Sequence, residues 1–234
     1  MTASGRDTIA PGLPTSAIPV QINPRGITVQ STDSRLQTLL DREELFDLVR
    51  RERFARDQRR FDVMLACFHP DAYVRTSWYD GHGGEAYVEA TRRMMGRTGG
   101  GKHWVFPAFA QIRRDRATVE SPAMIFSRAT IGGVEVDFFV FCRFFSRAVR
   151  IDGAWKLTTF EVIFERDVMN CVNPSDALPV DWSTMASLRP SYKFLTCVQR
   201  SRGITVSMDL LGDDRPDELA AFHAGEDRWL EDAV

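Results

Sequence analysis

The sequence predicts an α+β fold in which helices pack on one face of a bent antiparallel sheet. Two runs rich in β-branched and aromatic residues, 134–145 and 154–164, lie on either side of the dipeptide Asp152-Gly153. Asp-Gly favours a two-residue hairpin turn because both central positions need a positive φ. Helical patterns come first in the chain and strands follow, which is typical of α+β domains. Both runs are about twice the usual strand length of roughly five or six residues, so we expect the sheet to curve and enclose a cavity.

The composition is that of an ordinary globular protein. The chain has 234 residues, of which 44% are hydrophobic and 26% charged, and this predicts one main domain with appendages. The formal net charge of -2 gives no electrostatic reason to expect nucleic acid or a membrane surface as a partner. The first residues lack the apolar core of a signal peptide, and no window approaches the roughly 20 apolar residues of a membrane span. We therefore expect a cytoplasmic protein.

The cysteines and histidines share no metal-ligand spacing, so the sequence predicts no metal site. The cysteines are expected to be reduced, and at least two of them fall in apolar runs where a thiol acts as a small hydrophobic group. The four are Cys67, Cys142, Cys171 and Cys197.

Three regions follow from the distribution of proline and of apolar residues. Residues 1–37 are rich in proline, serine and glycine and are expected to form an extended arm. Residues 38–170 are expected to form the main domain. Residues 171–234 have too few apolar side chains for a core of their own, so we expect this extension to pack on the domain or on a neighbouring subunit.

The N-terminal part of the domain is predicted to be helical. Asp41 can cap a first helix, with Glu44 completing a box-like pair, and this helix should run to about Asp57. A second, short helix over 61–68 carries apolar residues at i, i+3, i+4 and i+7. His69-Pro70 should end it. The other predicted elements are a strand over 71–79, a helix over 85–97, strands over 102–112 and 117–131, a helix or strand over 192–199 and a helix over 216–229.

This order of elements resembles the nuclear transport factor 2-like superfamily, and in particular its scytalone dehydratase and SnoaL-like polyketide cyclase branch. The resemblance covers about residues 38 to 166 and implies a cone-shaped domain with helices on the concave face of the sheet. The segments that carry it are Arg53-Phe54-Ala55-Arg56-Asp57, Cys67-Phe68-His69-Pro70-Asp71-Ala72, Lys102-His103-Trp104 and Ile151-Asp152-Gly153-Ala154-Trp155-Lys156-Leu157.

The resemblance also implies a catalytic pair. In dehydratase and dehydrochlorinase members, an Asp near the end of the first helix and a His at the start of the strand after the third helix form an acid–base dyad. The matching residues are Asp57 and His103. The alternatives are a surface histidine beside Lys102 and an exposed helical ion pair between Asp57 and Arg53.

Other positions depart from the family pattern. Scytalone dehydratase has tyrosines where this chain has Arg56 and Thr76. Ser127 stands in place of a second histidine, and Phe144 in place of a strand asparagine. The resemblance therefore implies that proton transfer is kept, whereas the substrate differs from scytalone.

Alternation counted from the positions that the resemblance gives implies a mostly apolar cavity wall with a few hydroxyl groups, which suits an aromatic ligand. The expected inward residues are Val74, Thr76, Trp78, Ala123, Ile125, Ser127, Val140, Cys142 and Phe144. The predicted substrate-binding set is Thr76, Trp78, Ser127, Phe54, Ile125, Cys142 and Phe144. A core without a cavity is the alternative. Phe139, Phe141 and Phe145 would lie on the outer face, where such a stripe favours a subunit interface and a homo-oligomer, a dimer or trimer.

The loop 96–102 matches most of a phosphate-binding motif, but His103 follows the lysine and a helix precedes the loop, so nucleotide binding is not expected. No dinucleotide fingerprint occurs either. The sequence favours a cofactor-independent lyase that removes water or formaldehyde from a small aromatic substrate such as a lignin-derived dimer. A lignin-derived substrate is suggested because the lignin diarylpropane lyases resemble this chain in size and in their C-terminal tail. The alternatives are a non-catalytic small-molecule or protein-binding module, a polyketide cyclase or isomerase, and a structural subunit of a ring-hydroxylating dioxygenase.

Overall fold

The computed structural model describes residues 32–98 and 100–232. Contacts divide the chain into a unit that ends at Leu39 and a compact unit from Leu40 to Val234, and the fold is that of the second unit. Most of the expected N-terminal arm, residues 1–31, lies outside the described residues. The helices are α1 (Thr32–Asp57), α2 (Phe61–Ala66), α3 (Gly84–Thr98), α4 (Trp182–Met185), α5 (Lys193–Ser201) and α6 (Pro216–Glu231). The strands are β1 (Phe68–Arg75), β2 (Asp80–His82), β3 (Lys102–Val105), β4 (Phe109–Arg113), β5 (Arg116–Ile131), β6 (Val134–Ile151) and β7 (Ala154–Cys171).

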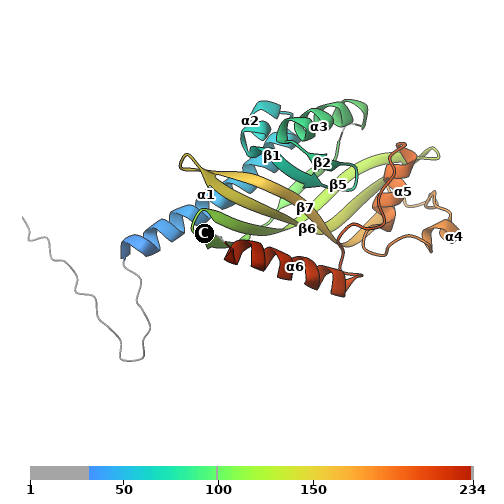
Figure 1. Ribbon diagram of the computed structural model, residues 1–234. Helices are drawn as coiled ribbons and strands as arrows, with labels where there is room; N and C mark the ends of the chain where they lie inside the picture. The colour runs from blue at the N-terminus through green and yellow to red at the C-terminus, as the bar shows by residue number, and fades with distance from the viewer. Residues whose placement is uncertain (1–31, 99, 233–234) are drawn as a thin grey trace, which may run out of the picture. The chain divides into compact units, whose positions relative to one another are not determined.

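The α+β prediction is confirmed: one bent sheet carries the helices (Figure 1). The strand order is β2-β1-β7-β6-β5-β3, and β4 also pairs with β5. The predicted sheet was antiparallel throughout, and this is wrong at one place, because β1 runs parallel to β7. Parallel neighbours need a long crossover. Here α3 and the strands β2 to β6 provide it.

The central hairpin forms as predicted. Asp152 has φ 51° and Gly153 has φ 79°, the two positive values that the turn requires. Both strands are longer than expected, at 18 residues each. No helix among the described residues is long and apolar enough to cross a membrane.

Two predicted boundaries near the N-terminus are wrong. Helix α1 begins at Thr32, so Asp41 lies inside it and forms an ion pair with Arg150 at 2.7 Å instead of capping it. No proline or glycine interrupts the helix between Thr32 and Asp41, so nothing in the sequence stops it there.

The second error concerns β1. It begins at Phe68, so Pro70 lies in a strand, where a helix end was expected. Proline cannot donate to a strand ladder and is tolerated at irregular positions. The pairing of β1 with β7 shifts register between Phe68 and Tyr73, which accommodates Pro70. The strand predicted over 102–112 is likewise broken in two around Pro107.

Side chains of β6 alternate between two covered faces. Val140, Cys142 and Phe144 are buried, as predicted for the inward face, and Phe138 is buried as well. The outward Phe145 is also buried, because Phe222 of α6 packs on it with ring centroids 5.0 Å apart. At Phe145 the outer face is therefore covered by the chain's own helix, where a subunit interface was expected.

Helix α6 lies on the side of the sheet opposite α2 and α3, so the helices are not confined to the concave face (Figure 1). Arg147 of β6 binds Glu226 of α6 through two hydrogen bonds of 2.6 and 2.8 Å. Helix α6 packs there because β6 places phenylalanine and arginine on its outward face, which gives a helix both an apolar and a charged contact.

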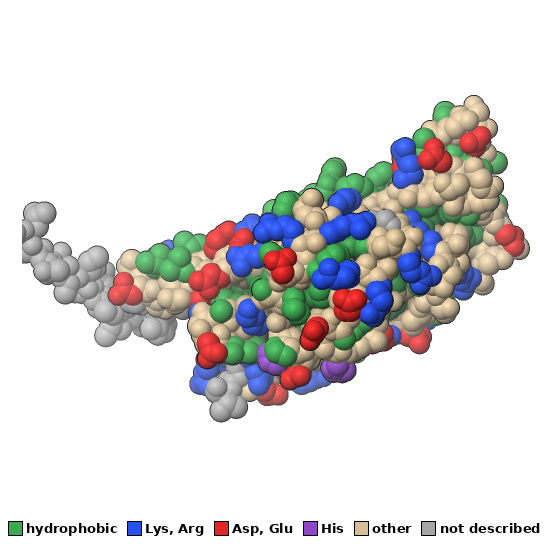
Figure 2. All heavy atoms as spheres, turned by 90° about the horizontal axis from the view of Figure 1, so that it is seen from above, with side chains coloured by type: hydrophobic (Ala, Val, Ile, Leu, Met, Phe, Trp, Pro, Cys, Tyr) green, Lys and Arg blue, Asp and Glu red, His purple; other side chains and the backbone are tan. Residues whose placement is uncertain are grey.

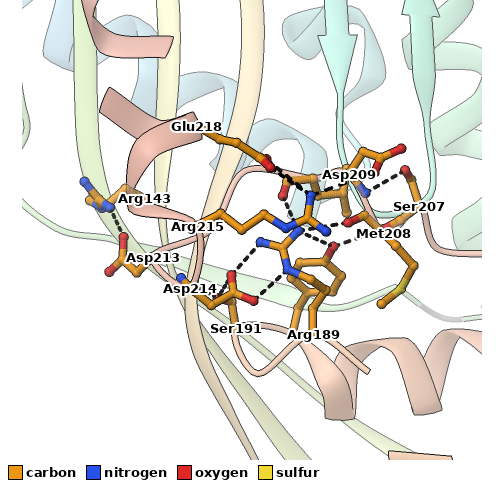
Figure 3. A network of polar contacts seen from close by, with 12 residues as sticks. Arg143, Arg189, Ser191, Ser207, Met208, Asp209, Asp213, Asp214, Arg215 and Glu218 are labelled. Carbon is orange, nitrogen blue, oxygen red and sulfur yellow. Dashed lines mark hydrogen bonds and ion pairs between the residues drawn. The ribbon is translucent and has the colours of Figure 1, made fainter. Parts of the chain in front are cut away.

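A polar network fastens the segment between α4 and α6 to the sheet (Figure 3). Arg189 is buried and binds Asp214 through two hydrogen bonds of 2.6 and 2.5 Å. Ser191 also donates to Asp214, and Arg143 of β6 binds Asp213 at 2.5 Å. Paired guanidinium–carboxylate contacts of this kind fix geometry as well as charge. The C-terminal extension thereby packs on the domain of the same chain.

Over the face seen in Figure 2, basic and acidic side chains are interspersed with apolar ones. This mixture agrees with the nearly balanced composition.

Candidate active site

The last turns of α1 carry the charged side chains of the site. Arg53, Arg56 and Asp57 are spaced i, i+3 and i+4, so they share one face of the helix. All three are at least nine-tenths buried. Arginine and aspartate are almost never buried without partners, so their contacts define the site.

Asp57 holds His103 by two of the histidine's groups. The ring nitrogen Nδ1 of His103 lies 2.8 Å from Oδ1 of Asp57, and the backbone N–H of His103 donates to Oδ2 at 2.7 Å. The His103 side chain is 4% exposed. Its Nε2 has no hydrogen-bond partner within residues 32–98 and 100–232. Because the carboxylate accepts the Nδ1 proton, Nε2 is the nitrogen that is left to accept a proton from a ligand.

Both ordinary alternatives for these residues are therefore wrong. His103 is not a surface histidine, and Asp57 does not form an exposed pair with Arg53. Arg53 instead binds its neighbour Glu52 through two contacts of 2.5 Å, and donates to the Tyr87 hydroxyl at 3.1 Å.

Arg56 lies against the pair. Its Nη1 is 2.9 Å from Oδ1 of Asp57, 3.2 Å from the carbonyl oxygen of Gly101 and 3.4 Å from Nδ1 of His103. Its Nε is buried and has no partner among the described residues. A positive charge is thus fixed beside the imidazole.

These surroundings set the protonation states of the pair. Burial lowers the pKa of His103, the nearby Arg56 lowers it further, and the hydrogen bond that His103 donates to Asp57 only partly opposes them, so the pKa falls to about 3. Burial alone would raise the pKa of Asp57, but the hydrogen bond with His103 and the charges of Arg56 and Arg53 outweigh it and keep that pKa below its usual value. The pair at neutral pH is a neutral imidazole on an ionised carboxylate.

Arg53 forms part of the cavity wall and stays charged. Burial lowers its pKa, but the Glu52 carboxylate more than compensates, and the net direction is upward. Its guanidinium lies 4.4 Å from the ring centroid of Phe160 and 5.5 Å from that of Phe144. Such cation–π contacts favour a desolvated arginine.

A cavity opens between α1, α5 and the inner face of the sheet, and His103 lines it. Its wall is mostly aromatic, with Trp78, Phe138, Phe144, Phe160 and Phe164. The volume is about 60 Å³, several times the roughly 10–15 Å³ that one water needs but below the roughly 150 Å³ that takes benzene. A two-ring ligand such as a lignin-derived dimer does not fit here as the side chains stand. Met94 lines the wall, and its unbranched side chain can yield to a single ring.

The structure brings only part of the predicted binding set to this cavity. The lining includes Thr76, Trp78, Ile125 and Phe144. Thr76 and Trp78 lie in the turn after β1, where a strand was expected, and the Thr76 hydroxyl accepts the backbone N–H of Tyr79 at 3.2 Å.

The other three predicted contacts lie elsewhere. Phe54 is 61% exposed, because it is one residue, and so about a third of a helical turn, away from the face that carries Arg53. Cys142 is buried in the core with its thiol directed at the carbonyl of Ala123. Ser127 faces the same side of β5 as Ile125 but lies just beyond the lining.

Sequence reasoning missed the part of the wall that α5 supplies. Leu195, Gln199 and Arg202 line the cavity although they lie in the C-terminal extension. Their spacing of four and three residues indicates one helix face, but no local signal directs that face to this cavity. Among the described residues, no group of three His, Cys, Asp or Glu side chains is placed to hold a metal ion.

Asp167 of β7 holds the start of α5 and gives the fold a pH-dependent contact. Its Oδ2 accepts the backbone N–H of Leu195 at 2.7 Å, and its Oδ1 is buried without a partner among the described residues. Burial raises the pKa of Asp167 to about 7. In the unfolded chain the Asp167 carboxyl ionises near pH 4, whereas in the folded chain it stays protonated up to about pH 7. The free energy of unfolding therefore falls as the pH rises from about 4 to about 7.

We therefore expect Asp167→Asn to melt about 5 °C above the unsubstituted protein at pH 8, and close to it at pH 4.5. Thermal unfolding at both pH values measures this, with the exposed Asp209→Asn as the control that should shift neither. A constant difference at the two pH values would contradict the raised pKa.

Comparisons with known proteins agree with this architecture. The profile of the SnoaL-like domain matches residues 37–161. Pea pathogenicity protein 2 of Fusarium vanettenii is 30% identical over 179 residues, which cover 75% of this chain and 77% of that protein. The structure of a type 2 hexachlorocyclohexane dehydrochlorinase, LinA, has a TM-score of 0.51 at 13% identity and covers 62% of this chain and 97% of that one. LinA type 3 from Novosphingobium barchaimii has a TM-score of 0.51 at 15% identity, covering 62% and 99%. At such identity these two structures show a common fold alone.

Proposed function

Because the chain belongs to the SnoaL-like domain family of the nuclear transport factor 2-like superfamily, which includes cofactor-free dehydratases, isomerases and cyclases, we propose that it is a cofactor-independent lyase. His103, oriented by Asp57, removes a proton from a compact aromatic substrate. The observation that carries the proposal is the buried hydrogen-bonded pair at the wall of an aromatic cavity, with Nε2 left to accept a proton.

In the elimination, Nε2 of His103 takes a proton from a carbon activated by a ring or a carbonyl. The electrons of the C–H bond form the new double bond, the bond to the leaving group breaks, and that group departs with its electron pair. The imidazolium returns its proton to the leaving group, which for a hydroxyl completes the loss of water. Asp57 stabilises the imidazolium while it exists. Loss of formaldehyde uses the same base on a primary hydroxyl: the O–H proton moves to Nε2, the C=O bond of formaldehyde forms as the C–C bond breaks, and the activated carbon takes the C–C electrons and then the proton from the imidazolium.

A histidine with a pKa of about 3 is a weak base. The same Arg56 charge that lowers the imidazole pKa also stabilises negative charge that develops on the substrate. Proton transfer depends on the difference between the pKa of the imidazole and that of the substrate C–H group, and the Arg56 charge lowers both. The Thr76 hydroxyl would orient a substrate oxygen, and Trp78 and Phe144 would stack on the ring.

The low basicity of His103 also favours a second candidate, a non-catalytic small-molecule binding module of the same fold. In that case the dyad would serve only as a hydrogen-bonding wall. A cyclase or isomerase would use the same base without a leaving group.

One screen separates these functions. The full chain, treated with a chelator and without added cofactor, is incubated with single-ring hydroxylated aromatic and polyketide-like compounds, followed by mass spectrometry. We expect at least one compound to lose the mass of a leaving group. Conversion at constant mass would support a cyclase or isomerase instead. Thermal-shift binding without conversion would support the binding module.

A further inference from the structure

Arg202, at the C-terminal end of α5, lines the same cavity as His103 and has no carboxylate partner among the described residues. Among the described residues its side chain makes one hydrogen bond, from Nη2 to the Ser127 hydroxyl at 3.5 Å, and its guanidinium lies 5.9 Å from the ring centroid of Phe138. The other two arginines of the wall are ion-paired, Arg53 with Glu52 and Arg56 with Asp57. The lining therefore carries one uncompensated positive charge.

Gln199 lies beside it. The residue is 8% exposed and three positions before Arg202, on the same face of the helix. Its side-chain amide lines the cavity and makes no hydrogen bond to any of the residues described. The amide of Gln199 and the guanidinium of Arg202, whose side chain makes only the 3.5 Å contact with Ser127, thus border the same space, where a ligand can supply partners for both.

An arginine at the end of a helix ordinarily interacts with the helix dipole from solvent. Arg200 fits that description, because it is exposed in the same last turn. Arg202 differs because it is half-buried, and burial lowers its pKa with no acidic group opposing the shift. A charge that has lost part of its water without gaining a counterion is satisfied when an anion binds.

The register of the sheet places the dyad and this charge beside successive inward positions of β5. His103 pairs with Ile125 of β5, and Ser127, the contact of Arg202, lies two residues further along the same face. At roughly 3.4 Å per residue these positions are about 7 Å apart, close to the length of one substituted ring. The aromatic wall lies alongside this space.

We propose that the ligand of this cavity carries a carboxylate, bound by Arg202 and Gln199, with its ring extending toward His103. The inference rests on the proposed function for the role of His103, but the binding site itself does not. A guanidinium and an amide supply donors for the two oxygens of a monoanion. A phosphate dianion would keep an uncompensated charge beside an aromatic wall. Arg202 also lines an open surface groove, whose other charged residues are Arg97, Arg128 and Glu135.

The probes are benzoate and benzamide, which share a ring and differ in charge, titrated calorimetrically into the full chain. We expect benzoate to bind at least 10-fold more tightly. A hydrogen bond to a charged group contributes roughly 10- to 100-fold, so Arg202→Met should lose about that factor for benzoate and leave benzamide unchanged. Arg200→Met, which removes an exposed arginine from the same helix, should change neither affinity.

Two further variants keep the test decisive. If Arg202→Met does not fold, Gln199→Glu should reverse the preference, because its carboxylate repels benzoate. Benzoate binding at Arg202 does not require His103, so His103→Gln should still bind benzoate. Absence of turnover in the compound screen would therefore count against the lyase and not against the carboxylate site. Equal affinity for the two probes, binding of neither, or an unchanged preference in the variants would overturn the proposal. Displacement of benzoate by inorganic phosphate at equal concentration would do so as well.

Discussion

Replacing His103 by glutamine is expected to lower turnover of the substrate found in the screen by about 10²- to 10⁴-fold, the usual contribution of a general base. Glutamine keeps a polar group of similar size but accepts no proton. Asp57→Asn should cause a loss in the same range, because an amide cannot stabilise the imidazolium and one of its two polar atoms can no longer accept a hydrogen bond.

Steady-state kinetics measures both losses, with His82→Gln as the matched control. His82 lies in β2, is exposed, and is not part of the cavity lining. Its replacement should leave turnover within about twofold. Near-normal turnover in His103→Gln would show that another group moves the proton.

The largest expected effect on stability is that of Glu52→Gln. Glu52 and Arg53 have side chains that are 1% and 5% exposed, and they are joined by two contacts of 2.5 Å. Removing one partner of such a buried pair leaves the other charge desolvated and typically costs about 3–5 kcal/mol of unfolding free energy. The substitution preserves shape, so loss of packing contributes little.

Urea denaturation gives the change in the free energy of unfolding. The matched control is Glu43→Gln on the same helix, whose ion pair with Arg50 is more than half exposed on both sides. Exposed pairs contribute about 0–1 kcal/mol, so this variant should unfold almost like the unsubstituted protein. If the two variants were equally stable, the pair of Glu52 and Arg53 would not hold α1 in place.

Features that depend on neighbouring residues in the sequence could be predicted. The hairpin follows from Asp152-Gly153, and the inward positions of Ile125 and Phe144 follow from alternation once the family resemblance gives a position to count from. The start of α1 and the start of β1 were misplaced because capping residues and proline give local preferences that the longer helix and the β1 register shift override.

The site was less accessible to sequence reasoning. Asp57 and His103 are 46 residues apart and were matched only through the family resemblance. Adjacent residues on a helix do not normally face each other, so the sequence gives no reason to pair Glu52 with Arg53. Arg53 is buried against Phe160 of the aromatic wall, and a buried arginine favours a charged partner, which Glu52 supplies. The α5 face reaches the cavity through tertiary packing, which includes the contact of Asp167 with the start of the helix.

The central claim is that His103 is a neutral base on an ionised Asp57, and it can be measured without knowing the substrate. Long-range ¹H–¹⁵N spectra of the full chain, labelled with ¹⁵N and recorded from pH 8 downward, report the charge and tautomer of each imidazole. The His103 signals are assigned by their absence in His103→Gln. We predict that His103 stays neutral, with its proton on Nδ1, well below the ordinary histidine pKa of 6.5, and titrates only near pH 3 if the fold persists. A His103 ring that is already charged at pH 6, or that carries its proton on Nε2 at pH 8, would contradict the claim.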